Sequence, residues 1–379
     1  MLYHLFDYLL GGANYAYKSV LFRATIGMLF GFAIVWLLAP RVIAALLRRK
    51  LGDIPEFDNV QVNELTRNKA NTPTMGGILI VSAMLITTLL LADLTNYYVR
   101  MGIFCLIWLG VLGGVDDWLK LSAQRRSGTR GGLRTYEKLL FQVALGVLLG
   151  YFIYQHGKSN FEAYAVVGAE QVPTYKVLTV PFYKSNVMLS VGAFMAVAVI
   201  VIAGTSNAVN LTDGMDGLAC GCAAVCSFVF LMFSFLVGDA KWAGYLLLPH
   251  VPFSGELAII CGAMTGACMG FLWYNCHPAM VFMGDTGSLP LGGIIGYVAI
   301  VTRHELMLFI VGGVFVLEAL SVIMQVGYFK LSRGRRVLRM APIHHHFQLA
   351  GWTETQTVTR FWLLGLMFAA LALATIKLR

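Results

Sequence analysis

The sequence Asn207-Ala-Val-Asn-Leu-Thr-Asp-Gly-Met-Asp-Gly217 lies between two long apolar segments, near residues 187–206 and 217–237. Carboxylates and amides at the end of a membrane helix are costly unless they bind something. Asp213 and Asp216 are three residues apart, so both would lie on one face near the positive N-terminus of the second helix. An N-cap with a tight turn is the simpler interpretation, but it explains only one Asp and one Asn. The stretch therefore predicts a site for a phosphorylated, sugar-bearing ligand assisted by a metal ion.

The composition predicts an integral membrane protein. Of the 379 residues, 58% are hydrophobic and only 12% are charged, which is too apolar for a soluble domain. Segments of roughly 20 apolar residues can cross a bilayer, and only helices satisfy their own backbone there. We therefore expect an all-α bundle forming one polytopic domain over residues 1–379, with about ten transmembrane helices. They lie near residues 19–40, 74–92, 100–118, 139–156, 187–206, 217–237, 256–274, 288–302, 306–328 and 361–377.

The basic residues predict the orientation of these helices. Most of the 28 Lys and Arg residues fall in the connections 41–73, 119–138 and 329–360. The positive-inside rule places those connections in the cytoplasm and both termini outside, in the periplasm of a two-membrane cell. Orientation and attraction to anionic headgroups account for most of this charge, and no motif supports binding of nucleic acid.

The connection at residues 156–186 has the only β-type pattern. Apolar residues alternate in the stretches 164–168 and 172–180. This pattern predicts a short β-hairpin outside the membrane, to which we assign no chemistry.

A second polar cluster, Asp116-Asp117-Trp-Leu-Lys120, ends the third apolar segment. Intramembrane acids are usually functional, although a solvated helix end remains an alternative. Lys69 precedes a Pro and Gly-Gly helix start that suits a phosphate, and the Gly- and Arg-rich loop from Lys120 to Lys138 suits phosphates too. For these lysines a pure topology signal is the competing interpretation.

A third polar cluster contains Asp285, placed between a glycine and a helix start. A carboxylate there would offer oxygen to a hard cation such as Mg²⁺. The consecutive residues His344, His345 and His346 lack the spacing of a helical zinc site, so we expect hydrogen bonds to phosphate or nucleotide, or a structural role. Glu318 lies within the ninth apolar segment without an obvious partner, and we assign it no catalytic role.

Together these motifs resemble one family, the bacterial phospho-N-acetylmuramoyl-pentapeptide transferases that synthesise lipid I. The resemblance runs from about Arg41 to the C-terminus, includes ten helices with both ends outside, and is most specific in the Met340 motif. Gln348 stands where the family usually has Glu. The motifs are Asn68-Lys-Ala-Asn-Thr-Pro-Thr-Met-Gly-Gly77, Asp116-Asp-Trp-Leu-Lys120, Asn207 to Gly217, Phe282-Met-Gly-Asp-Thr-Gly-Ser288 and Met340-Ala-Pro-Ile-His-His-His-Phe347.

The resemblance implies transfer of phospho-MurNAc-pentapeptide from UDP-MurNAc-pentapeptide to undecaprenyl phosphate, with release of UMP and a requirement for Mg²⁺. This reaction is the first membrane step of peptidoglycan synthesis, in the bacterial cell (inner) membrane with the active site facing the cytoplasm. Neutralising two approaching anions matters more in it than supplying a covalent group, so we favour direct transfer over a phospho-enzyme.

The resemblance also implies residue roles. Asp285, with Asp117, would hold Mg²⁺, and Asp116 and Asp117 would serve the lipid phosphate. Catalytic roles would fall to Asp116, Asp117, Asp285 and His344. Substrate contacts would come from Lys69, Asp216, Asn275 and Phe282 at the uridine, from Lys120 and Lys138 at phosphate, and from Asn207, Asn210, Asp213, His345 and His346 in the rest of the polar site.

Two other functions compete with this one. A sister enzyme would transfer N-acetylglucosamine phosphate, but the histidine motif argues against it. A secondary transporter would also carry buried carboxylates, yet transporters tend to place them at mid-bilayer between inverted repeats, and no repeat is visible here. The sequence leaves open whether the chain forms a homodimer.

Overall fold

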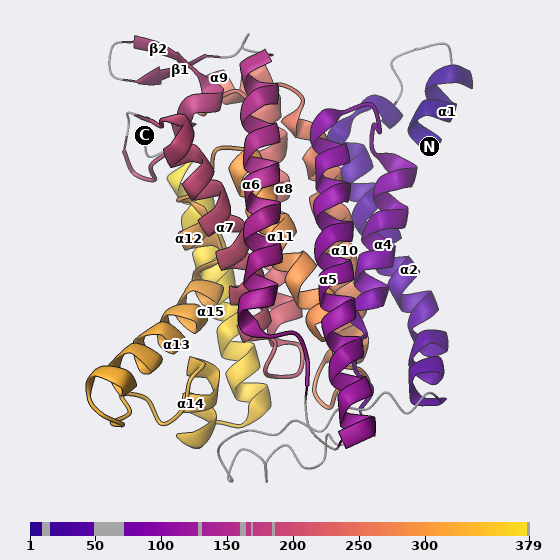
Figure 1. The fold of residues 1–379 in the computed structure, drawn as a ribbon. Helices are drawn as coiled ribbons and strands as arrows, with labels where there is room; N and C mark the ends of the chain where they lie inside the picture. Colours follow the sequence, from indigo (N-terminus) through magenta and orange to yellow (C-terminus); the bar gives the residue numbers. More distant parts are fainter. Residues whose placement is uncertain are drawn as a thin grey trace.

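The computed structural model describes residues 1–9, 16–48, 72–127, 131–159, 164–167, 170–183 and 186–376. Within these ranges the chain is a helical bundle with two small antiparallel strand pairs (Figure 1). The helices are α1 (Leu2–Leu9), α2 (Val20–Arg48), α4 (Gly77–Leu91), α5 (Tyr97–Ser127), α6 (Thr135–Ser159), α7 (Val191–Thr212), α8 (Leu218–Gly238), α9 (Ala240–Tyr245), α10 (Leu257–Asn275), α11 (Asp285–Val301), α12 (Leu308–Val311), α13 (Gly313–Leu331), α14 (Ile343–Leu349) and α15 (Glu354–Thr375), with 3₁₀ turns η1 (Ala16–Lys18), η3 (Thr174–Lys176) and η4 (Ser254–Glu256).

Nine of the ten predicted apolar segments each coincide with one helix. In the described ranges, eight helices are long and apolar enough to cross a membrane, and two shorter apolar helices, α4 and α11, complete the set. The outer helices expose large apolar side chains, such as Ile200 on α7, Ile323 on α13 and Met367 on α15. Such a surface is stable only against lipid, so the all-α membrane architecture is confirmed.

Helix α2 continues eight residues beyond the predicted end at residue 40, through Pro40. Proline has no N–H, so the carbonyl of Trp36 loses its helical partner. The hydroxyl of Tyr274, on α10, donates a hydrogen bond of 2.9 Å to that carbonyl. Helix α10 thus satisfies the group that the proline would have orphaned, which allows α2 to continue.

The predicted ninth segment, residues 306–328, is wrong as a single helix. The structure divides it into α12 and α13 at Gly312. Figure 1 shows α13 running obliquely away from the bundle, with α14 between it and α15. The break gives the second half of the segment a different direction from the first.

Helix α11 forms the centre of the bundle. All of its residues are buried, and it packs against α5 and α7. Helix α10 packs in turn against α2 and α8. Because α11 is surrounded by protein, its first residue, Asp285, is delivered to the interior of one end of the bundle.

The predicted β-hairpin is confirmed, although its second strand is shorter than the sequence pattern indicated. Strand β1 (Tyr164–Val167) pairs with β2 (Glu170–Pro173), and the chain then turns through η3. The residues that follow form β3 (Val177–Leu178), which pairs with β4 (Val187–Met188) instead. In Figure 1 this region and both chain ends lie at the same end of the bundle, opposite α14.

Candidate active site

The start of α11 is fixed to α5 by Asp117. One carboxylate oxygen, Oδ2, accepts hydrogen bonds from the Thr286 backbone N–H at 2.9 Å and from the Thr286 hydroxyl at 2.7 Å. The other oxygen accepts the backbone N–H of Asp285 at 3.2 Å. A carboxylate stabilises the positive N-terminus of a helix in this way. Asp117 therefore caps α11 from the neighbouring helix.

Close contact between α5 and α11 depends on Gly113. A Cβ atom built at this position would lie 2.1 Å from the backbone oxygen of Asp285. No side chain fits at that distance, and backbone cannot rotate away as a side-chain tip can. The glycine therefore allows Asp285 to approach the acids one turn further along α5.

Two lysines connect the carboxylates. Lys138 Nζ, from α6, lies 2.6 Å from both Asp116 Oδ2 and Asp285 Oδ2. Lys120 Nζ lies 2.7 Å from Asp116 Oδ2, 3.2 Å from Asp285 Oδ2 and 3.8 Å from Asp117 Oδ1. We call these five residues the acid–lysine cluster. Asp116 has no exposed surface, and its second oxygen accepts the Leu133 N–H at 2.7 Å.

Asn210 joins this cluster from α7. Its Nδ2 donates to Asp285 Oδ1 at 2.8 Å and to the Ser288 hydroxyl at 2.9 Å. Asp213, at the end of the same helix, lies near the cluster as well. Burial raises the pKa of the Asp213 carboxyl well above its ordinary value, and the charges of Asp285 and Asp117 raise it further. The acids therefore form one electrostatic unit.

Asn207 lies apart from the acids. Its Nδ2 donates to Gln142 Oε1 at 2.6 Å and to the backbone oxygen of Ala203 at 2.8 Å. Gln142 also bonds Ser206, so these side chains link α6 to α7 inside the bundle. Among the residues that the structure describes, the hydrogen bonds of Asn207 link helices and do not reach the acids, so its predicted substrate role stays a prediction.

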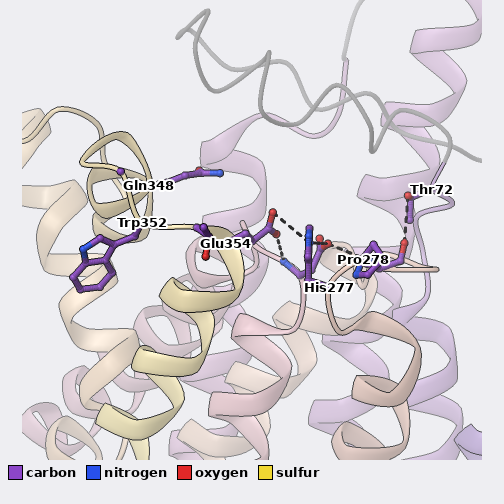
Figure 2. Close-up of a pocket in the computed structure, with 10 residues that line it drawn as sticks. Thr72, His277, Pro278, Gln348, Trp352 and Glu354 are labelled. Atoms are coloured by element: carbon purple, nitrogen blue, oxygen red, sulfur yellow. Dashed lines mark hydrogen bonds and ion pairs between the residues drawn. The ribbon is translucent and has the colours of Figure 1, made fainter.

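A second group combines Asp216 with His277 and Glu354, and we call it the histidine-bridged cluster. His277 Nδ1 lies 3.0 Å from Asp216 Oδ2 and 3.6 Å from Glu354 Oε2. Glu354 Oε1 also accepts the backbone N–H of Asp216 at 2.9 Å. Figure 2 shows Glu354 and His277 directed toward one another beside a cavity of about 580 Å³. The cluster ties the turn after α7 to the loop before α11 and to the start of α15.

Asn275 and Phe282 frame the loop that carries His277. Asn275 is buried, accepts the Gly217 N–H at 3.0 Å and donates to the Val281 carbonyl at 2.8 Å. The Phe282 backbone exchanges hydrogen bonds with Pro73 and Gly76, at 2.8 Å each. Asn275 thus holds the α7–α8 turn, whereas Phe282 is half-buried next to the segment that precedes α4.

The three histidines have different surroundings. His344 is fully buried, and its Nδ1 lies 3.0 Å from Glu318 Oε2. The ring of His345 is buried beside it, with Nδ1 3.2 Å from Gln348 Oε1. His346 Nδ1 accepts the backbone N–H of Arg339 at 3.1 Å, which directs it to its own loop. His344 and His345 lie against the polar turn, since a Cβ atom built at Gly214 would be 2.4 Å from His344 Nε2 and 3.5 Å from His345 Nε2.

The acid–lysine cluster fits a hard divalent cation. In the described part of the chain, two groups of three acidic or histidine residues have donor atoms within 4.8 Å of one another, namely Asp116, Asp117 and Asp285, and the histidine-bridged cluster. The first offers only carboxylate oxygens, the donors that Mg²⁺ prefers. The predicted residue Lys69 lies outside the described residues.

The sequence did not indicate three contributors. His277 and Glu354 were missed as partners of Asp216, and Glu318 was recognised without its partner. For His277, the only signal in the sequence was the His-Pro pair at 277–278 inside a polar cluster. Each pairing joins segments far apart in the chain, so periodicity and spacing contain no information about it.

Comparisons with known proteins identify the family of the chain. The model of glycosyl transferase family 4 matches residues 99–303, and phospho-N-acetylmuramoyl-pentapeptide-transferase signature 1 matches residues 69–81. A phospho-N-acetylmuramoyl-pentapeptide-transferase of Thermodesulfovibrio yellowstonii is 43% identical over 380 residues, covering 100% of this chain and 99% of its own length. Proteins of the same name are 43% identical in Desulfotalea psychrophila, over 100% of both chains, and 41% identical in Rickettsia bellii, over 96% of this chain and 95% of the relative. The chain belongs to the phospho-N-acetylmuramoyl-pentapeptide-transferase family.

Proposed function

We propose that the chain transfers phospho-MurNAc-pentapeptide from UDP-MurNAc-pentapeptide to undecaprenyl phosphate, giving lipid I and UMP. Full-length similarity to the family supports this reaction. The observation that carries the proposal is the acid–lysine cluster, which gathers three carboxylates and two ammonium groups from α5, α6 and α11. A reaction between two phosphate-bearing substrates needs such a concentration of compensating charge.

In this reaction an oxygen of the lipid phosphate forms a bond to the phosphorus that carries the sugar. The bond from that phosphorus to the bridging oxygen breaks, and UMP leaves with the electron pair. Lys120 and Lys138 would offset the negative charge that gathers on the phosphates. We favour direct attack because each acid of the cluster is already engaged, Asp117 by the start of α11 and Asp116 and Asp285 by the lysines.

Asp285 and Asp117, next to Asp116, are the residues that we propose to hold Mg²⁺. When bound, the ion would neutralise diphosphate charge and polarise the bond that breaks. Asn210 would keep the Asp285 carboxylate oriented, because it donates to the oxygen that the lysines do not contact. Asp116 would hold both ammonium groups near the phosphates.

The uridine is proposed to lie toward the histidine-bridged cluster. Asp216 lines the cavity here, Asn275 braces the turn beside it, and Phe282 lies on the loop that continues from His277. Lys69 belongs to the segment matched by the family signature. The site would face the cytoplasm of a bacterial cell, at the side of the bundle that carries most of the basic residues. Both ends of the chain lie at the opposite side of the bundle. Residues 1–379 would act as one domain.

The decisive measurement is UMP release by the full-length protein, purified in detergent, with undecaprenyl phosphate and UDP-MurNAc-pentapeptide. We expect release that requires Mg²⁺ and that falls about 100-fold or more in Asp285→Asn. Asp7→Asn is the matched control, since this half-buried acid lies at the opposite end of the bundle near Tyr17 and Lys18.

A parallel reaction with UDP-N-acetylglucosamine tests the donor. Release from that donor alone would assign the chain to the sister activity. Release from neither donor, by protein that remains monodisperse and folded, would contradict the proposed function and favour transport.

A further inference from the structure

Helix α13 presents a polar stripe to the protein and an apolar surface outward. Glu318, Ser321 and Gln325 are buried, and their spacing places them along one face of the helix. Leu320 and Ile323, on other faces, are exposed. Gln325 accepts the backbone N–H groups of Val337 and Leu338 at 3.1 and 2.9 Å. The polar stripe therefore holds the segment that leads into α14.

Glu318 is the charged member of this stripe and has no exposed surface. A carboxylate inside an apolar helix is strongly destabilising unless it is paired. Its Oε2 lies 3.0 Å from Nδ1 of His344, which is also fully buried. Because a carboxylate can only accept a hydrogen bond, Nδ1 carries a proton whenever Glu318 is ionised. Nε2 is then the ring atom at which a proton or a ligand can be exchanged.

The position of Nε2 is set by the turn after α7. A Cβ atom at Gly214 would lie 2.4 Å from His344 Nε2, so the ring edge rests against this turn, one residue from Asp213. Within the part of the chain that the structure describes, Nε2 has no hydrogen-bond partner. A buried polar atom in that condition is destabilising unless a ligand satisfies it.

We propose that Glu318 is a positioning residue for the transfer reaction: it fixes the tautomer and orientation of His344 so that Nε2 meets a substrate phosphate oxygen at the Gly214 turn. The inference rests on the proposed function and on the catalytic role that the family resemblance implies for His344. Among the described residues, the hydrogen bonds of Glu318 are to His344 and within its own helix. Glu318 would therefore act on the reaction through the imidazole. Carboxylates that bond the second ring nitrogen of a functional histidine act in the same way.

The test compares Glu318→Gln, His344→Gln and the double variant in the full-length protein. We expect Glu318→Gln to lower kcat about 10- to 100-fold while the KM of each substrate stays within about twofold. The double variant should be no slower than His344→Gln alone, because removing the imidazole removes the only route by which Glu318 acts. Ser321→Ala is the matched control, one turn along the same buried face.

Losses that multiply in the double variant, or a kcat of Glu318→Gln equal to that of Ser321→Ala, would overturn the proposal. Inactivity of the unmodified protein would instead contradict the proposed function. If Glu318→Gln does not fold, ¹⁵N spectra of histidine-labelled unmodified protein give the same answer. The His344 signal, identified by its loss in His344→Gln, should show a protonated Nδ1, and an unprotonated Nδ1 would refute the assignment.

Discussion

The acid–lysine cluster and the histidine-bridged cluster each bring three possible metal-binding side chains within 4.8 Å of one another, yet their surroundings differ. The first lies between membrane helices, where all three acids are buried. The second joins a turn, a loop and a helix start beside a cavity, and the His277 side chain is 39% exposed. Burial strengthens every charge interaction, so each carboxylate has a larger effect in the first cluster.

Charge compensation separates the two clusters further. Three carboxylates of the acid–lysine cluster outnumber its two ammonium groups, so a divalent cation would make the cluster positive and attractive to phosphate. The histidine-bridged cluster has two carboxylates and one imidazole but no lysine. With fewer positive charges to offset its acids, this cluster is less suited to binding phosphate. Donor count alone therefore does not identify the reaction centre, and the chemistry should be far more sensitive to the first cluster than to the second.

The strongest test of this difference is Lys138→Met. The change removes two ion pairs of 2.6 Å and leaves buried carboxylates with one lysine. We expect kcat/KM to fall about 100- to 1,000-fold, measured as UMP release. The exposed residue Lys241, at the far end on α9, provides the control Lys241→Met. If both variants remain fully active, the acid–lysine cluster is a structural brace and the distinction fails.

A second test separates the position of the acids from their charge. Gly113→Ala adds no charge but places a Cβ atom 2.1 Å from the Asp285 carbonyl oxygen, so α5 and α11 must move apart. A displacement of about 1 Å is expected to lower kcat about 100-fold. Gly327→Ala, on α13, adds the same methyl group where nothing lies within 4 Å. Equal activity of the two variants would show that the site tolerates displacement of Asp285.

The polar clusters were predictable from sequence because intramembrane acids are rare, and the helices were predictable because the apolar segments are long. Which helices are neighbours was not predictable. Lys138 and Asp285 are 147 residues apart, and their contact depends on how α6 and α11 pack around α7. The break at Gly312 was missed for a related reason, since a continuous apolar run does not reveal a change of direction. Asn207 and Asn210 looked equivalent in the sequence because both lie in the same polar stretch. Only their positions along α7, one turn apart, decide which of them reaches the acids.

That last pair provides a matched test with a smaller expected effect. Asn210→Ala removes a hydrogen bond of 2.8 Å to the Asp285 carboxylate and should lower kcat about tenfold, the equivalent of roughly 1.4 kcal/mol for a bond to a charged group. Asn207→Ala removes the described bonds to Gln142 and Ala203, which link helices, so it should reduce the thermal unfolding temperature and leave kcat within about twofold. The reverse ranking in UMP-release assays would place Asn207 in the site instead.

The smallest effect is expected in the histidine-bridged cluster. Glu354→Gln retains an acceptor for the Asp216 N–H but removes the charge beside His277. Because His277 is partly exposed, solvent screens the lost interaction, and we expect the KM for the UDP-linked donor to rise about two- to fivefold with kcat unchanged. Glu137→Gln, a first-turn acid of α6 that accepts the Arg134 N–H, is the matched control. A loss of kcat in Glu354→Gln as large as that in Lys138→Met would show that the two clusters act as one reaction centre.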